Sequence, residues 1–203
     1  MYAIMRRLLV VMVAIPLVSC VGTPSYMTTT AALSMPDATT AVVRFLRPLD
    51  FKFAAARTWA VLDGEKAIGN LPHGMQFDYV TTPGQHLFIT PGHRTTRTPG
   101  SLTAGPYFLE ADLGPGKTYY VVVRLHTEAG VERVWLTPIT RRTEQWNEVP
   151  SYEKDLTRLE PNRASLAAWS TKHGGEIKAL LRTYDEKWKH ERQWATIGPD
   201  DGV

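Results

Sequence analysis

Between residues 40 and 140 the chain alternates short apolar runs with turn signals. The runs are rich in β-branched and aromatic residues, as in residues 118–125, which read TYYVVVRL, and such residues favour β-strands. Glycine, proline and Asp-Gly pairs separate the runs at intervals of roughly eight to twelve residues, a spacing typical of an all-β sandwich or barrel. The pattern therefore predicts a mainly β domain, an antiparallel β-sandwich of about seven or eight strands.

The segments expected to form strands each combine an apolar run with a turn at its end. They are residues 41–46, 58–62, 65–70, 76–80, 85–90, 107–113, 118–125 and 131–136. Asp63-Gly64 lies between the second and third of them, and this pair is a strong signal for a tight hairpin. Residues 91–100 are polar and begin and end with Pro-Gly, which predicts a surface loop.

After residue 140 the pattern changes, and residues 141–203 are expected to form a connector followed by C-terminal helices. Asn162 can cap the first helix. In the last helix apolar residues recur at helical spacing and form one face, which contains Ile177, Leu180, Leu181, Tyr184 and Trp188. Such a face must be covered, either by the β domain or by a partner protein or the membrane surface. An envelope protein partner would bind through Ile177, Leu181, Tyr184 and Trp188.

The start of the chain has the order of a secretory signal peptide. Arg6 and Arg7 precede the apolar residues 8–18, and the small residue Ser19 stands before Cys20. The apolar run is too short for a spanning helix, which needs about 20 residues. We therefore expect residues 1–19 to be a signal peptide that is cleaved between Ser19 and Cys20.

Residues 17–20, Leu-Val-Ser-Cys, resemble the lipobox of bacterial prolipoproteins. The resemblance implies that the Cys20 thiol receives a diacylglycerol and that the new amine is acylated, for example with palmitate. Val21 stands where an aspartate would signal retention in the inner membrane, which implies an outer-membrane anchor facing the periplasm. Residues 20–39 are rich in Thr, Ser, Ala and Pro, which predicts a flexible tether. The alternative is that part of this segment forms an extra edge strand.

Four segments of the β region follow one another in a characteristic order. Residues 43–48 are an apolar strand that ends in Arg-Pro, residues 61–71 surround the Asp-Gly turn, residues 80–86 contain Pro-Gly-Gln-His, and residues 115–121 read PGKTYYV. Together they resemble a poorly characterised family of bacterial lipoprotein domains, small β-sandwiches of unknown function in the style of PEGA domains. The resemblance covers about residues 41–140, and it implies no catalytic residue and no cofactor.

The charge of the chain bears on its possible partners, and its cysteine content bears on disulfide formation. The 203-residue chain has 23 basic and 20 acidic residues, and loss of Arg6 and Arg7 with the signal peptide leaves 21 basic residues. A nucleic-acid partner is not expected, because such proteins carry a strong, clustered basic patch. Cys20 is the only cysteine, so a lipidated chain could form no disulfide.

The sequence contains no recognisable catalytic or metal-binding motif. None of the six histidines has a second histidine at the i, i+4 spacing of a helical zinc site, and no metal ligand or cofactor is expected. A Gly-x-Ser-x-Gly elbow is absent. Glu110 and Asp112 alternate on one strand and fit a solvated sheet face, and residues 114–117 lack the helix that follows a phosphate loop. No catalytic residue is therefore expected.

Five residues outside the expected strands are candidates for ligand binding. Trp146 and Tyr152 lie in the charged connector, where aromatic side chains could stack on sugar rings or anchor a protein interface. His93, Arg94 and Arg97 lie in the long loop, where the arginines could bind an anionic glycan or a phosphate. The alternative is that the two aromatic residues cover an edge of the sandwich and that the loop is simply solvated.

These observations lead to three hypotheses for function. The first is a lipid-anchored bacterial envelope protein of structural or interaction type, without catalysis. The second is a periplasmic module that binds peptidoglycan or another glycan. The third is a hydrolase whose site residues are too scattered to recognise in the sequence.

Overall fold

The structure is a computed structural model that describes residues 26–49, 58–91, 105–128, 131–191 and 193–203. Its strands are β1 (Met27–Thr29), β2 (Ala41–Arg47), β3 (Trp59–Asp63), β4 (Lys66–Leu71), β5 (Met75–Thr81), β6 (Gly84–Thr90), β7 (Tyr107–Leu113), β8 (Thr118–Glu128), β9 (Val131–Ile139), β10 (Thr157–Pro161) and β11 (Ala195–Ile197). Its helices are the 3-10 helix η1 (Glu144–Glu148), α1 (Val149–Asp155), α2 (Arg163–Thr183), the π-helical turn η2 (Tyr184–Trp188) and α3 (Lys189–Glu191). The expected signal peptide with Ser19, together with Cys20, lies outside the described residues.

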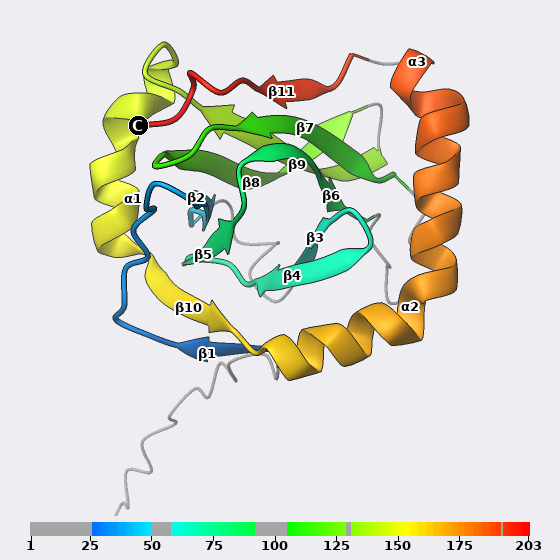
Figure 1. The fold of residues 1–203 in the computed structure, drawn as a ribbon, viewed down its shortest axis with the longest axis horizontal. Coiled ribbons are helices and arrows are strands. Elements are labelled where there is room, and N and C mark those ends of the chain that lie inside the picture. Colours follow the sequence, from blue (N-terminus) through cyan, green and yellow to red (C-terminus); the bar gives the residue numbers. More distant parts are fainter. Residues whose placement is uncertain (1–25, 50–57, 92–104, 129–130, 192) are drawn as a thin grey trace, which may run out of the picture.

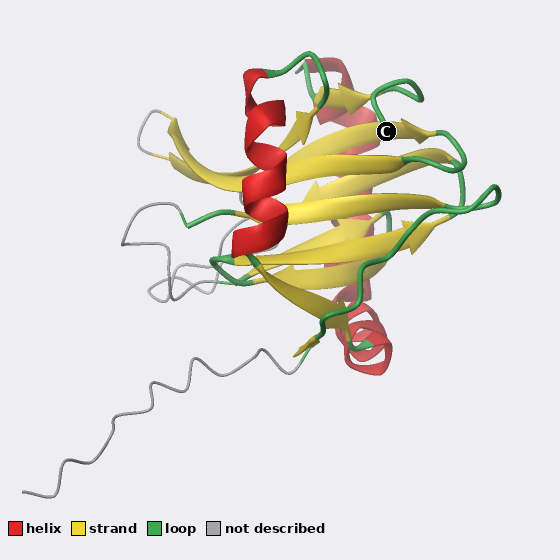
Figure 2. Ribbon diagram, turned by 90° about the vertical axis from the view of Figure 1, so that its left-hand side faces the viewer, coloured by secondary structure: helices red, strands yellow, loops and turns green. Residues whose placement is uncertain are grey.

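Two β-sheets face each other, and helices cover their outer faces (Figures 1 and 2). The first sheet has the strand order β1-β10-β5-β2-β8-β9, and the second has the order β11-β7-β6-β3-β4. Most neighbouring strands are antiparallel, but the pairs β2 with β8, β5 with β10 and β7 with β11 are parallel. Both sheets are therefore mixed.

The mainly β fold with a C-terminal helix is confirmed, and each of the eight expected strands is present as one of β2 to β9. The expectation of a purely antiparallel sandwich with at most eight strands is corrected, because β1, β10 and β11 add to the sheets. These three strands have only three to five residues each. Strands this short carry too few alternating positions to be recognised from the pattern of the sequence.

The ends of the chain differ from the expected division into tether, β domain and connector. Met27 in β1 is buried, and its strand pairs with β10, so this part of residues 20–39 forms the edge strand that was the alternative to a flexible tether. Beyond residue 140, β10 and β11 join one sheet each. The C-terminal segment therefore belongs to the same two sheets as the β domain.

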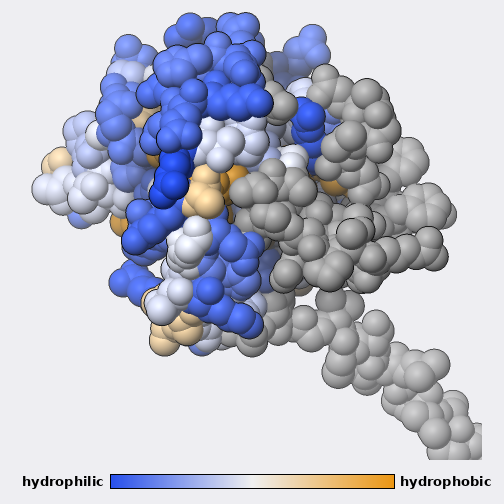
Figure 3. Space-filling view, turned by 90° about the vertical axis from the view of Figure 1, so that its right-hand side faces the viewer, coloured by the Kyte–Doolittle hydropathy of each residue, from blue (hydrophilic) through white to orange (hydrophobic). Residues whose placement is uncertain are grey.

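Helix α2 and the turn η2 cover the outer face of the second sheet. Ile177, Leu180 and Tyr184 are buried against Leu62, Ile89 and Phe108 of this sheet, and Leu181 and Trp188 pack beside them. The helical face that the sequence offered for an envelope partner is thus covered by the chain's own sheet. The described residues that are visible from the α2 side of the molecule are mainly hydrophilic (Figure 3). Within the described part of the chain, no helix is long and apolar enough to cross a bilayer.

The core between the sheets is built around three buried phenylalanines. The rings of Phe45 and Phe77 stack with centroids 5.0 Å apart, and Phe88 meets Phe45 edge-on at 5.4 Å. Gly69 of β4 lies directly against Phe77, and a Cβ atom there would be only 2.7 Å from Cε1 and 2.8 Å from Cε2 of the ring. The missing side chain at residue 69 therefore allows β4 to approach the first sheet closely.

Gly69→Ala tests this close approach. We expect the free energy of unfolding to fall by about 1–3 kcal/mol, because the added methyl group must displace a packed ring. The matched control is Gly175→Ala in α2, where a Cβ atom meets nothing within 4 Å, and it should raise stability by about 0.5–1 kcal/mol. Urea unfolding followed by tryptophan fluorescence measures both. Wild-type stability of Gly69→Ala would contradict the packing.

Candidate functional site

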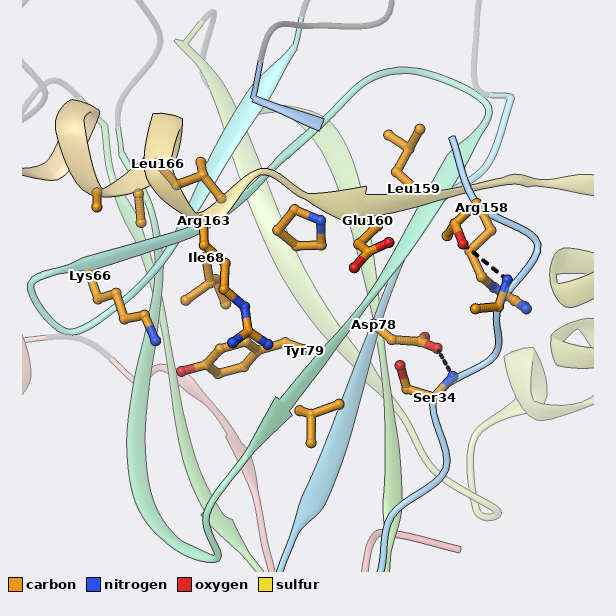
Figure 4. A pocket seen from close by; sticks show the side chains of 16 residues that line it. Ser34, Lys66, Ile68, Asp78, Tyr79, Arg158, Leu159, Glu160, Arg163 and Leu166 are labelled. Carbon is orange, nitrogen blue, oxygen red and sulfur yellow. Dashed lines mark hydrogen bonds between the residues drawn. The ribbon is translucent and has the colours of Figure 1, made fainter. Parts of the chain in front are cut away.

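A cavity of about 470 Å³ lies where β4 of the second sheet approaches β5 and β10 of the first (Figure 4). The first turns of α2 and the segment that follows β1, with Thr30, Ala32 and Ser34, complete its walls. This volume falls in the range of about 300–1,000 Å³ that is usual for small-molecule sites. The cavity is therefore large enough for a ligand.

The inner wall of the cavity is apolar. Ala67 and Ile68 of β4, Leu159 of β10 and Leu166 of α2 are buried residues that line it. They come from both sheets and from the helix, so the cavity forms only when these elements pack together. An apolar wall of this kind favours the hydrophobic part of a ligand.

Asp78 is the lining residue that is most firmly held. Its Oδ1 accepts a 2.6 Å hydrogen bond from Nε of Arg44, a residue that is only 3% exposed, and its Oδ2 accepts from the Ser34 backbone N–H at 2.9 Å. The carboxylate of Glu153 in α1 also pairs with Arg44 and accepts a 3.0 Å bond from the Tyr120 hydroxyl. Asp78 is therefore engaged within the protein, and it shares the single positive charge of Arg44 with Glu153.

The pKa shifts of Arg44 and Tyr120 agree with this network of ion pairs and hydrogen bonds. Burial alone would lower the pKa of Arg44, but the hydrogen bond and charge of Asp78 outweigh burial and raise it. Burial and the nearby Glu153 carboxylate raise the pKa of Tyr120 to about 12. At neutral pH the guanidinium is therefore charged and the Tyr120 hydroxyl is a neutral donor.

A second cluster, next to the cavity, joins Tyr79, Asp63 and His86. The Tyr79 hydroxyl donates to Asp63 Oδ2 at 2.9 Å, and His86 Nδ1 lies 2.8 Å from the same oxygen. His86 Nε2 lies 2.9 Å from the Thr82 carbonyl oxygen. Both ring nitrogens face acceptors, and the cationic imidazole, which carries a hydrogen on each nitrogen, is the form that satisfies both contacts. The hydrogen bond to Asp63 raises the pKa of His86 in agreement with this state.

This cluster places a histidine beside a carboxylate, as a hydrolase site requires, but its groups are already engaged. With both nitrogens donating, His86 has no lone pair with which to accept a proton. Burial and the Asp63 carboxylate raise the pKa of Tyr79 to about 12, and its hydroxyl is used by Asp63. Only the ring of Tyr79 is left to face the cavity (Figure 4).

Four further charged side chains line the cavity without forming an ion pair among the described residues. Three are basic, Lys66, Arg158 and Arg163, and one is acidic, Glu160. Lys66 Nζ lies 5.6 Å from the centroid of the Tyr79 ring, a distance at which a cation is attracted to the ring face. The buried Nε of Arg158 has no hydrogen-bond partner in the described structure. The charge of this group is net positive.

The structure does not bring the sequence candidates together at this cavity. His93, Arg94 and Arg97 lie outside the described residues. Trp146 packs edge-on against Tyr120 at 5.7 Å, and the Tyr152 hydroxyl accepts a 3.0 Å bond from Arg124. Both aromatic residues pack with α1 against the outer face of the first sheet. This position is closer to the alternative that they cover part of the sandwich than to an exposed ligand site.

The residues that do line the cavity were missed in the sequence for a physical reason. They come from segments near residues 30–34, 66–68, 78–80 and 158–167, and no local motif connects these segments. One signal was present, because Arg44 interrupts the apolar strand VVRFL and a charge in a buried run needs a partner. Among the described residues, no group of three or more His, Cys, Asp or Glu side chains could hold a metal ion.

The state of His86 predicts how stability depends on pH. Its pKa is raised in the folded protein, so its contribution is fully present below its ordinary value of 6.5 and is lost as the pH rises through the raised value. Between about pH 6 and about pH 9 the wild-type protein should therefore lose more unfolding free energy than His86→Gln does. Asp63→Asn should reduce the loss in the same way. Urea titrations at both pH values measure it, and parallel curves for all three proteins would refute the cationic state.

Comparison of the chain with protein-family models, with curated proteins and with solved structures found no match. The expected likeness to PEGA-style lipoprotein domains stays a prediction. The function of the protein has to be inferred from its own cavity and from the segments that form it.

Proposed function

We propose that the protein is a lipid-anchored protein of the bacterial envelope that binds a small ligand, without catalysis, in the cavity between β4, β5, β10 and α2. The observation that carries the proposal is the combination of a buried apolar wall with charged side chains that lack ion-pair partners among the described residues. Ligand sites typically combine an apolar lining with a few polar groups that fix orientation.

Three features favour binding over catalysis in this cavity. Asp78 is held by Arg44 and by the Ser34 backbone N–H. His86 has both ring nitrogens engaged, and the Tyr79 hydroxyl donates to Asp63. Each of these groups is already hydrogen-bonded within the protein, which disfavours a role as general base or acid. This proposal adds a bound small ligand to the structural or interaction role that the sequence favoured, and an envelope protein partner stays a prediction.

The proposed anchor would hold the cavity close to the membrane. The Tyr26 carbonyl accepts a 2.8 Å hydrogen bond from the Asn162 backbone N–H at the start of α2, which fixes the chain beside the cavity. Tyr26 follows Cys20 by six residues. At about 3.5 Å per residue, this segment can span at most about 20 Å. A ligand carried in or near the bilayer would therefore be within easy reach.

The anchoring part of the proposal is tested by replacing Cys20. Cells fed a palmitate analogue should label the wild-type protein, and Cys20→Ala should abolish the label because the acceptor thiol is gone. Ser19→Ala is the matched control, since it keeps the cysteine and a small residue before it, and it should still be labelled. An unlabelled wild-type protein with a free N-terminus in mass spectrometry would rule out the lipid anchor.

The binding part is tested with phenylnaphthylamine, a neutral fluorescent probe. Residues 20–203 are used, with Cys20→Ala in every variant so that no detergent is required. Ala167→Trp places an indole in the cavity lining and should weaken probe binding by about tenfold or more, equivalent to about 1.4 kcal/mol. The matched control is Ala164→Trp, one turn earlier on α2 and outside the cavity lining, which should bind like the parent. Equal binding by all three chains, or by none, would argue against a ligand site here.

A further inference from the structure

The charges around the cavity are unequally distributed. Lys66 and Arg163 come from β4 and from the start of α2, and both side chains run toward the ring of Tyr79 in Figure 4. Arg158 lies toward the other end of the cavity. Against these three cations the described lining has two carboxylates: Glu160, which forms no ion pair there, and Asp78, which shares the single charge of Arg44 with Glu153.

We infer that the cavity selects an amphiphile with a single anionic head group, which it binds with the head near Lys66 and Arg163 and the apolar body against Ile68, Leu159 and Leu166. This inference rests on the proposed ligand binding and names the chemical class of the ligand. The head group can be a carboxylate, a sulfonate or a phosphate, since each presents oxygens that accept from ammonium and guanidinium donors.

Tyr79 is the residue that joins the two halves of the site. Its hydroxyl is held by Asp63 at 2.9 Å, so the ring is fixed and cannot offer a polar group to the ligand. Lys66 lies over this ring at 5.6 Å, which keeps the ammonium close to the apolar surface. An anion that reaches Lys66 therefore brings its hydrophobic body into contact with the ring and with the inner wall.

A cationic or neutral polar ligand fits this arrangement less well. In the described lining a cation would face three basic side chains and two carboxylates, one of which, Asp78, is already paired with Arg44. A fully polar ligand would leave the walls formed by Ala67, Ile68 and Leu166 in contact with polar atoms, which gains no hydrophobic stabilisation. A cation-binding site with a dominant group of carboxylates is absent from the described lining.

Two probes that differ by one group provide the test. Anilinonaphthalene sulfonate is phenylnaphthylamine with an added sulfonate, so the difference in their affinities isolates the anionic head. We expect the sulfonate probe to bind residues 20–203 with Cys20→Ala about tenfold more tightly than the neutral probe. Added salt should weaken only the sulfonate probe, because charge interactions at an accessible rim are screened.

Substitutions then locate the head group. Lys66→Gln and Arg163→Gln should each weaken the sulfonate probe by about three- to tenfold more than they weaken the neutral probe. Lys178→Gln is the matched control, because it makes the same charge change at an exposed position of α2 outside the cavity lining. It should leave both affinities unchanged. Unfolding midpoints equal to that of the parent chain show that each variant is folded.

The outcomes separate this inference from the proposed function. One outcome is that the neutral probe binds and is weakened by Ala167→Trp, but the sulfonate probe binds no more tightly than the neutral probe. Another is that the double variant Lys66→Gln, Arg163→Gln binds the sulfonate probe as tightly as the parent chain does. In either case the anionic preference is wrong and the ligand site stands. If neither probe responds to Ala167→Trp, both proposals fail.

Competition identifies the ligand chemistry further. Laurate and dodecyl phosphate should displace the sulfonate probe, and their ratio reports whether a carboxylate or a phosphate head is preferred. Inorganic phosphate should compete far less well, because it lacks the apolar body. Displacement by inorganic phosphate as effective as that by dodecyl phosphate would overturn the amphiphile assignment.

Discussion

The structure depends on a guanidinium buried in the middle of an apolar strand. Removing the charge of Arg44 from water costs several kcal/mol, and this cost is offset only because Asp78, Glu153 and Tyr120 surround the group. The partners come from β5, α1 and β8. One ionic network therefore fixes α1 on the first sheet and links three neighbouring strands, and loss of Arg44 would leave the buried Asp78 carboxylate without its counter-charge.

The same network shapes the cavity. Asp78 also holds the backbone of Ser34, so the segment between β1 and β2 becomes one wall of the ligand site. Because Arg44 pairs with this carboxylate, the charged side chains of the described lining that form no ion pair are Lys66, Arg158 and Arg163 against Glu160. In the proposed ligand site these basic side chains are the partners of an anionic head group.

A second polar cluster, formed by His86, Asp63 and Tyr79, also connects segments that are distant in the chain. His86 and Asp63 join β6 to β3, and Asp63 also takes the hydroxyl of Tyr79 from β5. The two sheets are thereby tied together by polar groups at the margin of the core, beside the stacked phenylalanines. Because these polar groups satisfy one another, the described lining of the cavity keeps the ring of Tyr79 and three basic side chains that form no ion pair there, and this combination supports the proposed ligand binding.

The sequence by itself determined the eight strands β2 to β9 and the amphipathic C-terminal helix, because alternation and helical periodicity are local properties that a short window of residues carries. Only the tertiary structure decided the parallel pairing of β2 with β8, the use of Met27–Thr29 as a strand, and the meeting of Lys66, Tyr79 and Arg163 at one cavity. Those features join segments that are far apart in the chain, and their stability comes from burial and charge pairing that no single segment contains.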